Sequence, residues 1–281
     1  MIATKSRPAR ADHPELQGLL SRPYPAVMGV LNVTPDSFSD GGQFLAPERA
    51  LAQARRLVAE GADIIDIGAE STRPYGSQPV SAEEELNRLR PILGEVVSLG
   101  VPVSIDSMKP AVIAWALDSG ASIANDVWGL QRDPDMAGVI AKHNSPVIVM
   151  HNRERADPGI DIMQDIAAFF TRSLAIADRA GISRQNIVLD PGIGFGKTPE
   201  QSMTALARLN ELSSFGLPLL VGASRKRFIS SVTPSEPDQR LGGSIAAHLA
   251  AVKGGARIIR AHDVSETVQA LRVAAAIWDR Q

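Results

Sequence analysis

The chain has 281 residues, of which 44% are hydrophobic and 21% are charged, as in a soluble globular protein with either two ordinary domains or one large α/β barrel. The formal net charge is −2, and acidic and basic residues are mixed along the chain, which argues against a nucleic-acid-binding surface. Cysteine is absent, which excludes disulfides, thiolate metal sites and a cysteine nucleophile. No apolar run approaches the ~18 residues of a membrane helix, and the first residues lack the hydrophobic region of a signal peptide, so we expect a cytoplasmic protein.

Residues 1–25 contain several prolines and show no sustained hydrophobic period. The sequence therefore predicts an N-terminal arm that is partly flexible or lies against the body, and we assign it no chemistry. Residues 26–281 are expected to form a single domain, because no low-complexity linker interrupts them.

From residue 26 onward, short apolar strands alternate with helical segments. The predicted strands are 26–31, 63–67, 101–105, 121–124, 146–150, 187–189, 217–221 and 257–260. The predicted helices are 47–60, 82–98, 110–118, 134–142, 162–180, 199–213, 239–253 and 264–279. Uniformly apolar strands indicate a parallel sheet covered by helices, and the even alternation favours a (β/α)₈ TIM barrel over a doubly wound sheet.

Polar residues follow the carboxyl end of each predicted strand. In strand order they are Asn32; Glu70 with Ser71, Thr72, Arg73 and Pro74; Asp106; Asn125 with Asp126; His151; Asp190; Ser224 with Arg225 and Lys226; and Arg260 with His262. The carboxyl ends of barrel strands meet at one rim, where active sites of this fold lie. These residues are therefore expected to converge.

The stretch around Asp190 shows the pattern most clearly. The apolar run Ile187–Leu189 ends at this acid, which is followed by Pro191 and three glycines, so a buried strand delivers a carboxylate to a tight loop. A ligand with paired N–H groups would offset the cost of burying it. A turn-forming role for Asp190 is the alternative. The following Gly196-Lys197-Thr198 is not a phosphate loop, because Pro191 stands where that motif needs glycine.

The rim residues form two chemical groups. Asp106, Asn125 and Asp190, completed by Lys226, suit the N–H and carbonyl edge of a flat heterocycle. Cations and donors suited to a phosphorylated group are Arg73, Arg260 and His262, with Asn32 as an oxygen ligand for Mg²⁺.

Each assignment has a structural alternative. Arg260 or His262 could form an ordinary ion pair with Asp263 or another acid, and Asp106 could cap helix 110–118 through Ser107. Asn125 and Asp126 could belong to a turn, and Ser224 could be an N-cap. No His-Glu-x-x-His or Gly-x-Ser-x-Gly motif is present, which argues against covalent catalysis by a side chain.

Several long motifs resemble those of dihydropteroate synthases. They are MGVLNVTPDSFSDGG (28–42), DIGAESTRP (66–74), SIDS (104–107), DPGIGFGK (190–197), GASRK (222–226) and RAHDV (260–264). The resemblance spans about residues 27–275 and implies an enzyme of folate biosynthesis. Such an enzyme joins 4-aminobenzoate to 6-hydroxymethyl-7,8-dihydropterin diphosphate, makes dihydropteroate and releases pyrophosphate.

The resemblance also implies residue roles. Asp106, Asn125, Met150, Asp190, Lys226 and Arg260 would hold the pterin, and Asn32, Arg73, Arg260 and His262 the diphosphate, with Mg²⁺ on Asn32. The aminobenzoate site would comprise Thr72, Arg73, Pro74, Phe195 and Ser224, with the stem of Lys226. Asn32, Arg73, Lys226, Arg260 and His262 would act in catalysis. The family is commonly dimeric, so a homodimer without nucleic-acid or membrane partners is expected.

Two features depart from the family pattern. The residues after His151 are Asn152-Arg153-Glu154-Arg155, and the second loop, with Tyr75, is one residue longer than expected. The alternatives are a methyltetrahydrofolate:corrinoid methyltransferase, which would not need Arg73 and its neighbours, and a catalytically silent pterin-binding relative.

Overall fold

The computed structural model describes residues 13–33, 45–70 and 80–280 of the chain. Eight parallel strands form a closed barrel in sequence order. They are β1 (Ala26–Asn32), β2 (Ile64–Gly68), β3 (Val103–Asp106), β4 (Ile123–Asp126), β5 (Val147–Met150), β6 (Ile187–Asp190), β7 (Leu219–Val221) and β8 (Ala256–Ala261). The predicted (β/α)₈ barrel is confirmed, and the strands lie within one or two residues of their predicted positions.

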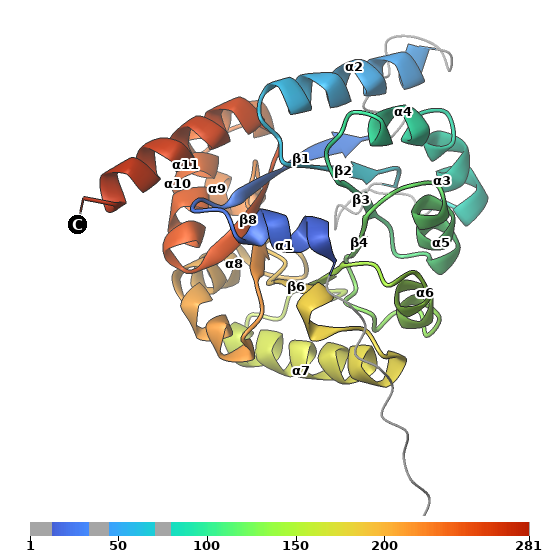
Figure 1. Ribbon diagram of the computed structural model, residues 1–281. Coiled ribbons are helices and arrows are strands. Elements are labelled where there is room, and N and C mark those ends of the chain that lie inside the picture. The colour runs from blue at the N-terminus through green and yellow to red at the C-terminus, as the bar shows by residue number, and fades with distance from the viewer. Residues whose placement is uncertain (1–12, 34–44, 71–79, 281) are drawn as a thin grey trace, which may run out of the picture.

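Helices surround the strands, as Figure 1 shows. The α-helices are α1 (Pro14–Leu20), α2 (Leu45–Ala59), α3 (Ala82–Leu89), α4 (Leu93–Val97), α5 (Pro110–Asp118), α6 (Met136–His143), α7 (Ile162–Ala180), α8 (Pro199–Ala207), α9 (Arg227–Val232), α10 (Leu241–Lys253) and α11 (Val264–Trp278). Short 3₁₀ turns are η2 (Arg184–Asn186), η3 (Leu209–Phe215) and η4 (Pro237–Gln239).

Two predicted helices are divided in the structure. The segment predicted as one helix over 82–98 forms α3 and α4, because Pro91 has no N–H for the helical hydrogen bond and interrupts the run. The segment predicted over 199–213 leaves the α-helical conformation at Arg208, with φ −107° and ψ 19°, and continues as η3.

Inward-facing residues divide the barrel interior into an apolar lower part and a polar upper part. One buried cluster inside the strands contains Ala26, Met28, Ile64, Ile123, Ile148, Val188, Leu220 and Ile258. Side chains two residues apart on a strand face the same side. The next inward positions toward the carboxyl end are therefore Asp66 after Ile64, Asn125 after Ile123, Met150 after Ile148, Asp190 after Val188 and Arg260 after Ile258.

Helix α1 closes the amino-terminal end of the barrel, and in Figure 1 it lies across the centre of the ring of strands. Its buried residues Leu16 and Leu19 join the inner apolar cluster. The segment belongs to residues 1–25, for which the sequence predicted an arm that is partly flexible or lies against the body, and no helix. Seven residues are too few to establish a helical period, and only the contact with the barrel identifies the helix.

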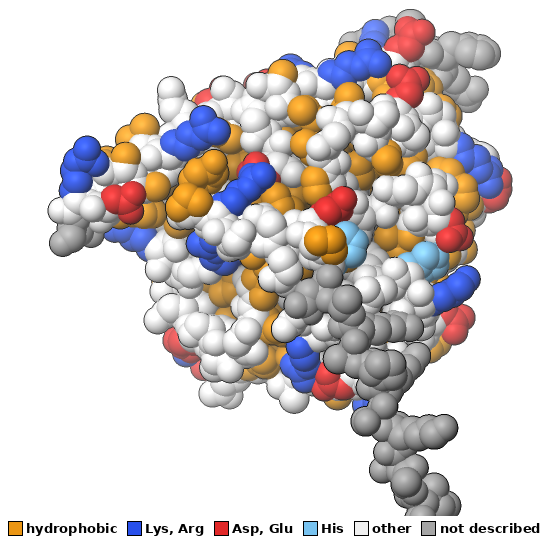
Figure 2. All heavy atoms as spheres, in the orientation of Figure 1, with side chains coloured by type: hydrophobic (Ala, Val, Ile, Leu, Met, Phe, Trp, Pro, Cys, Tyr) orange, Lys and Arg blue, Asp and Glu red, His pale blue; other side chains and the backbone are white. Residues whose placement is uncertain are grey.

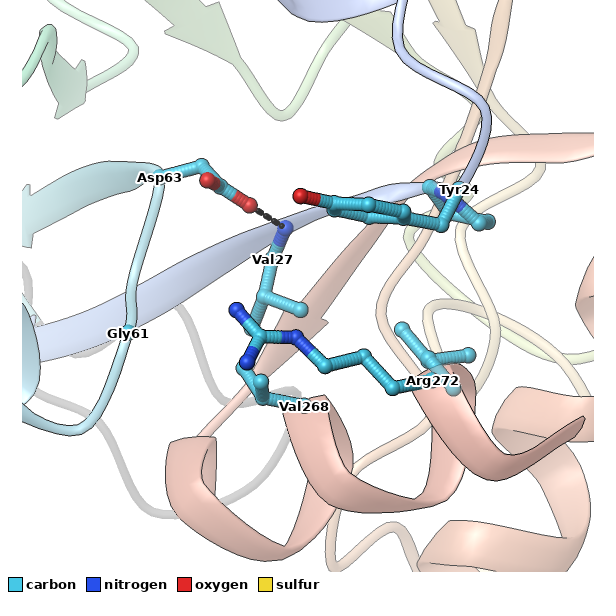
Figure 3. Close-up of a pocket in the computed structure, with 8 residues that line it drawn as sticks. Tyr24, Val27, Gly61, Asp63, Val268 and Arg272 are labelled. Carbon is cyan, nitrogen blue, oxygen red and sulfur yellow. Dashed lines mark hydrogen bonds between the residues drawn. The ribbon is translucent and has the colours of Figure 1, made fainter. Parts of the chain in front are cut away.

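The segment between α1 and β1 is fastened to the barrel wall. Asp63 accepts a hydrogen bond from the Val27 N–H at 2.9 Å and forms an ion pair with Arg22. The Arg257 guanidinium donates to the Leu20 carbonyl at 2.8 Å. A small pocket lies beside these contacts, where Tyr24 and Arg272 of α11 extend over Val27 (Figure 3). These bonds hold α1 against the strands.

The face around α1 carries acidic and basic side chains interspersed with apolar ones (Figure 2). No helix in the described part of the chain is long and apolar enough to cross a membrane.

Candidate active site

A cavity opens at the carboxyl ends of the strands, and it encloses about 300 Å³ including the solvent at its mouth. Its lining contains the predicted pterin-site residues together with Phe195: Asp106, Asn125, Met150, Asp190, Phe195, Lys226 and Arg260. The remaining lining residues are Val127, Gly192, Ile193 and Gly222. The polar groups predicted to read a flat heterocycle therefore meet in one place.

The two carboxylates of the cavity are buried and easily protonated. Burial raises the pKa of Asp106 to about 7, and the nearby Asp66 carboxylate adds to this effect. Burial also raises the pKa of Asp190 to about 6, although the Gly192 N–H, which donates to its Oδ1 atom at 2.7 Å, works in the opposite direction. The Oδ1 atom of Asp106 is buried with no hydrogen-bond partner among the described residues. The cavity therefore offers acceptors to a ligand with N–H groups.

Arg260 forms ion pairs with acids other than Asp263, as one alternative from the sequence allowed. Its Nε atom donates to Asp66 Oδ2 at 2.6 Å, and its Nη2 atom donates to Asp106 Oδ2 at 3.1 Å. Asp263 instead forms an ion pair with Arg225. The guanidinium is thus held in the cavity by two carboxylates along one edge.

Lys226 also lines the cavity. Its Nζ atom is 4.0 Å from the centre of the Phe195 ring, a cation–π distance. Gly194 makes room for its stem, because a Cβ atom at Gly194 would be 3.2 Å from Lys226 Cδ. The φ of Gly194 is +81°, a conformation that glycine adopts without strain. Lys226 and Phe195 thus form one wall together.

Ser224 and His262 are paired beside the cavity. The His262 backbone N–H donates to Ser224 Oγ at 3.2 Å, and this oxygen is also 3.0 Å from His262 Nδ1. Burial and the neighbouring Arg260, Arg225 and Lys226 lower the pKa of His262 to about 3. The lowered pKa favours the neutral ring at pH 7, in which His262 can still act as a hydrogen-bond donor. If the Ser224 hydroxyl donates to Nδ1, the proton of the neutral ring is on Nε2.

Asn32 ends β1 at the same rim. A Cβ atom at Gly68 would lie 3.7 Å from Asp106 Oδ2 and 3.9 Å from Asn32 Oδ1, so this glycine keeps the space between the two oxygens open. The described residues contain no cluster of three or more carboxylate or histidine side chains suited to a metal. Thr72, Arg73, Pro74 and Tyr75, which the sequence assigned to the second loop, lie outside the described residues.

The structure decides three further alternatives. Asp106 itself does not cap α5, although its neighbour Ser107 accepts from the N–H of Lys109, the N-cap residue, at 3.2 Å. Asp126 accepts from the N–H groups of Trp128 at 2.9 Å and Leu130 at 2.7 Å, so it shapes the loop while its neighbour Asn125 enters the cavity. Ser224 is not an N-cap, because α9 begins at Arg227 and the N-cap position is Lys226.

Residues 28–262 match the family of pterin binding enzymes. The dihydropteroate synthase of Bacillus subtilis is 42% identical over 255 residues, which cover 90% of this chain and 89% of that protein. The chain belongs to the dihydropteroate synthase family. A dihydropteroate synthase of Xanthomonas albilineans, solved with 4-aminobenzoic acid, has a TM-score of 0.88 at 43% identity and covers 92% of this chain and 94% of that chain. The Xanthomonas albilineans enzyme in complex with 7,8-dihydropteroate gives a TM-score of 0.84 at 42% identity, covering 92% and 95%.

The fifth loop packs against the sixth loop. It is the loop in which this member of the dihydropteroate synthase family departs from the expected pattern. Arg153 forms an ion pair with Asp165 at 2.9 Å. A Cβ atom at Gly196 would be 2.3 Å from the Arg153 carbonyl oxygen, and Gly196 has a φ of +52°, so the two loops touch through their backbones. Arg153 does not line the cavity in the described structure.

Two buried groups received no functional assignment from the sequence. Asp66 lies inside the barrel below the cavity and is fully buried. Lys197 is also buried and donates to His151 Nδ1 at 2.6 Å and to the Gly192 carbonyl at 2.9 Å. A charged residue within the apolar run of β2 was the available signal for Asp66.

Proposed function

We propose that the chain catalyses the condensation of 6-hydroxymethyl-7,8-dihydropterin diphosphate with 4-aminobenzoate, giving 7,8-dihydropteroate and pyrophosphate. The observation that carries this proposal is the convergence of Asp106, Asn125, Asp190, Lys226 and Arg260 on one cavity at the carboxyl end of the barrel. Membership of the dihydropteroate synthase family supports the same activity.

The buried acceptors would bind the pterin ring by its edge. Asp106, Asn125 and Asp190 accept from ring N–H groups, and Lys226 donates to a ring acceptor. Met150 lines the slot with an apolar, polarizable side chain, and the face of the Arg260 guanidinium is available for stacking. A ring that left these groups without partners would bind poorly, because buried polar groups are costly when unpaired.

The diphosphate would extend toward Asn32 and His262. The neutral His262 ring can donate from Nε2 to a phosphate oxygen, while Arg260 contributes positive charge, and the proposal also assigns Arg73 to this group. Asn32 is the proposed protein ligand of Mg²⁺, which keeps few protein ligands and binds mainly phosphate oxygens and water. The open space between Asn32 Oδ1 and Asp106 Oδ2 fits this use. When bound, Mg²⁺ would stabilise the charge that develops on the leaving pyrophosphate.

The second substrate would lie against the wall formed by Phe195 and the Lys226 stem. Ser224, at the same rim, supplies a hydroxyl group near His262. The proposal places Thr72, Arg73 and Pro74 at this subsite too. An aromatic ring packed on Phe195 would have its amino group directed toward the pterin methylene carbon.

In the reaction the C–O bond between the methylene carbon and the diphosphate breaks, and a C–N bond to the amine forms. The attacking amine loses one proton to solvent or to pyrophosphate. An arylamine is neutral at pH 7, so no strong general base is required, and the donors around the diphosphate stabilise the departing charge by electrostatics.

Pyrophosphate release from the pterin diphosphate, measured with and without 4-aminobenzoate, tests the proposal. We expect release to depend on the amine and to equal the dihydropteroate formed. Release that ignores the amine would refute the synthase activity. Binding of the pterin without any release would indicate a silent relative, and turnover of methyltetrahydrofolate with a corrinoid would indicate a methyltransferase.

The expected cytoplasmic location and homodimer remain part of this proposal. Val273 and Ile277, one turn apart on α11, are both more than half exposed. Exposed apolar side chains on one helix face support an interface between copies. Light scattering of the purified protein distinguishes a dimer from a monomer.

A further inference from the structure

Asp66 is a charged side chain inside the barrel with no contact to solvent. It is 0% exposed, and it lies on β2 between the inner apolar residue Ile64 and the rim residue Gly68. It is absent from the cavity lining, yet its carboxylate binds two side chains that do line the cavity, Asn125 and Arg260. A buried charge is costly unless it is paired, so these bonds determine where Asp66 can sit.

Asp66 determines which end of the Asn125 amide faces a ligand. The Nδ2 atom of Asn125 lies 3.3 Å from both carboxylate oxygens of Asp66. An ionised carboxylate only accepts hydrogen bonds, so the NH₂ group of Asn125 must turn toward it. The carbonyl oxygen of Asn125 is then the group presented to the cavity, where it acts as an acceptor.

Asp66 also determines the orientation of the Arg260 side chain. The Nε atom of Arg260 donates to Asp66 at 2.6 Å, and its Nη2 atom donates to Asp106 Oδ2 at 3.1 Å. This pairing occupies one oxygen of Asp106 and leaves Oδ1, which is buried without a partner among the described residues. The second acceptor of the cavity thus depends on Asp66 through Arg260.

We infer that Asp66 is a positioning residue that sets the hydrogen-bond pattern of the pterin pocket, by fixing Asn125 as an acceptor and holding Arg260 edge-on to Asp106. This inference rests on the proposed function and specifies its ligand as a ring that presents N–H donors to both positions. Asp66 itself does not touch the ligand.

The charge of Asp66 also acts on the Asp106 carboxyl group and contributes to raising its pKa. The charged groups that face Asp106 are Asp66 of β2, Glu85 of α3, Lys226 and Arg260. Burial raises the pKa of Asp106 to about 7, and Asp66 is the next contributor. Removing the Asp66 charge lowers the pKa of Asp106, and it also lets Arg260 interact with Asp106 alone, which lowers the pKa further. Asp106 then stays ionised to a lower pH.

The test compares four proteins in calorimetric titrations with 6-hydroxymethylpterin: the wild type, Asp66→Asn, Asn125→Asp and the double variant. Asp66→Asn is expected to weaken binding by roughly 5- to 150-fold, the range for one unsatisfied buried polar group. Its binding should also persist to lower pH than that of the wild type. Asn125→Asp alone places two carboxylates together and is expected to weaken binding as well.

The double variant restores the complementary pair. The NH₂ group of residue 66 can then donate to the new carboxylate at 125, its carbonyl oxygen can accept from Arg260 Nε, and the combined charge of the two positions is unchanged. Its affinity should exceed that of both single variants. A role confined to packing would give no such rescue and no change in pH dependence.

Ser104→Ala is the matched control. Ser104 pairs in register with Asp66 on the neighbouring strand, is fully buried, and its hydroxyl has no hydrogen-bond partner among the described residues. The Ser104→Ala variant should bind the pterin with the affinity of the wild type.

Equal affinity and equal pH dependence in Asp66→Asn and the wild type would overturn the inference. If Asp66→Asn fails to fold, the comparison of Asn125→Asp with the double variant decides, and absence of rescue overturns the inference. A wild-type protein that does not bind the pterin would instead refute the proposed function.

Discussion

Asp106 and Asp190 are equally buried acids, but different groups hold them. Asp190 accepts from the backbone N–H of Gly192 at 2.7 Å, whereas Asp106 accepts from the Arg260 guanidinium at 3.1 Å and lies near a second acid. Their pKa values are raised to about 6 and about 7, chiefly by burial. Because ligand N–H groups bind the ionised forms, affinity for the pterin should fall as the pH drops from 7 toward 6.

We predict that Asp190→Asn weakens pterin binding by roughly 30- to 700-fold, or about 2–4 kcal/mol. The amide keeps the shape of the side chain but replaces one acceptor oxygen with an NH₂ group, which would oppose a ligand N–H. Calorimetry with 6-hydroxymethylpterin at pH 8, where both acids of the wild type are ionised, measures the change. Thermal melting should show that the barrel is still folded.

Asp126→Asn is the control for this substitution. Asp126 is also buried, its pKa is likewise raised to about 6 by burial, and it likewise ends a barrel strand, β4. It accepts from the Trp128 and Leu130 N–H groups and does not line the cavity. Its variant should lose stability while keeping its affinity for the pterin. Equal losses of affinity in both variants would contradict a direct role for Asp190.

Among individual residues, the sequence predicted the acids and cations at the strand ends, because strand periodicity and the closed barrel place them on one rim. It did not predict their partners. Asp66 precedes its strand end by two residues, so a search for polar residues after strands passes over it. The neutral state of His262 also depends on Arg225, Arg260 and Lys226, which come together only in the folded chain.

The loop that follows β6 is organised around Lys197. Its ammonium group has three donors. They reach His151 Nδ1 at 2.6 Å, the Gly192 carbonyl at 2.9 Å and the Phe195 carbonyl at 3.2 Å. His151 Nε2 in turn lies 2.9 Å from Asp165 Oδ2, so the neutral ring donates there and accepts from Lys197. The conformation of the loop that carries Phe195 thus depends on one buried lysine.

We predict that Lys197→Met lowers the free energy of unfolding by about 1–3 kcal/mol, because three buried acceptors lose their donor. It should also raise KM for 4-aminobenzoate more than KM for the pterin diphosphate. The carbonyl of Phe195 loses its support, whereas Asp106 and Asn125 stand on other strands. Denaturant unfolding and steady-state kinetics measure the two effects.

The pH dependence of stability provides an independent check on Lys197. Burial lowers the pKa of Lys197 to about 7, so between pH 7 and about 10 the unfolded chain binds this proton more readily than the folded protein. Stability attributable to this lysine therefore rises with pH across that window. Lys197→Met should lack the rise, and Lys142→Met, at an exposed position of α6, should retain it. Identical pH profiles for both variants would contradict the role given to Lys197.

The sequence could not predict this arrangement of loops. Gly196 and Lys197 lack the glycine spacing of a phosphate loop, and the direction of the Lys197 ammonium group depends on the position of His151. A Cβ atom at Gly192 would be 1.9 Å from the His151 carbonyl oxygen, and Gly192 has a φ of +65°. The glycines therefore indicate that this loop is in close contact with another segment. The sequence alone does not reveal that the other segment is the loop after β5.

Among the described residues, α1 and the inner apolar side chains fill one end of the barrel, and the polar cavity lies at the other. The same strands build both ends, since Ile64 precedes Asp66, Val188 precedes Asp190 and Ile258 precedes Arg260 by one inward step. This repeated pattern is why the barrel and the side of its site could be predicted from the sequence. Helix α1 could not be predicted, because its segment is too short to show a helical period. Its two buried leucines are recognised as core residues only once the strands have closed into a barrel.

The stability of the whole barrel should therefore depend on a helix remote from its chemistry. Leu16 is 1% exposed and packs into the inner apolar cluster. Leu16→Ala is expected to lower the free energy of unfolding by about 2–5 kcal/mol, the range for emptying a buried leucine site. Affinity for the pterin should not change in the folded variant, because the cavity lies at the opposite end of the barrel.

Urea unfolding and calorimetry measure these quantities, with Glu15→Ala, at an exposed position of the same helix, as the control. If Leu16→Ala is as stable as Glu15→Ala, α1 does not seal the barrel, and a loss of pterin affinity in the folded variant would show that the two ends are coupled.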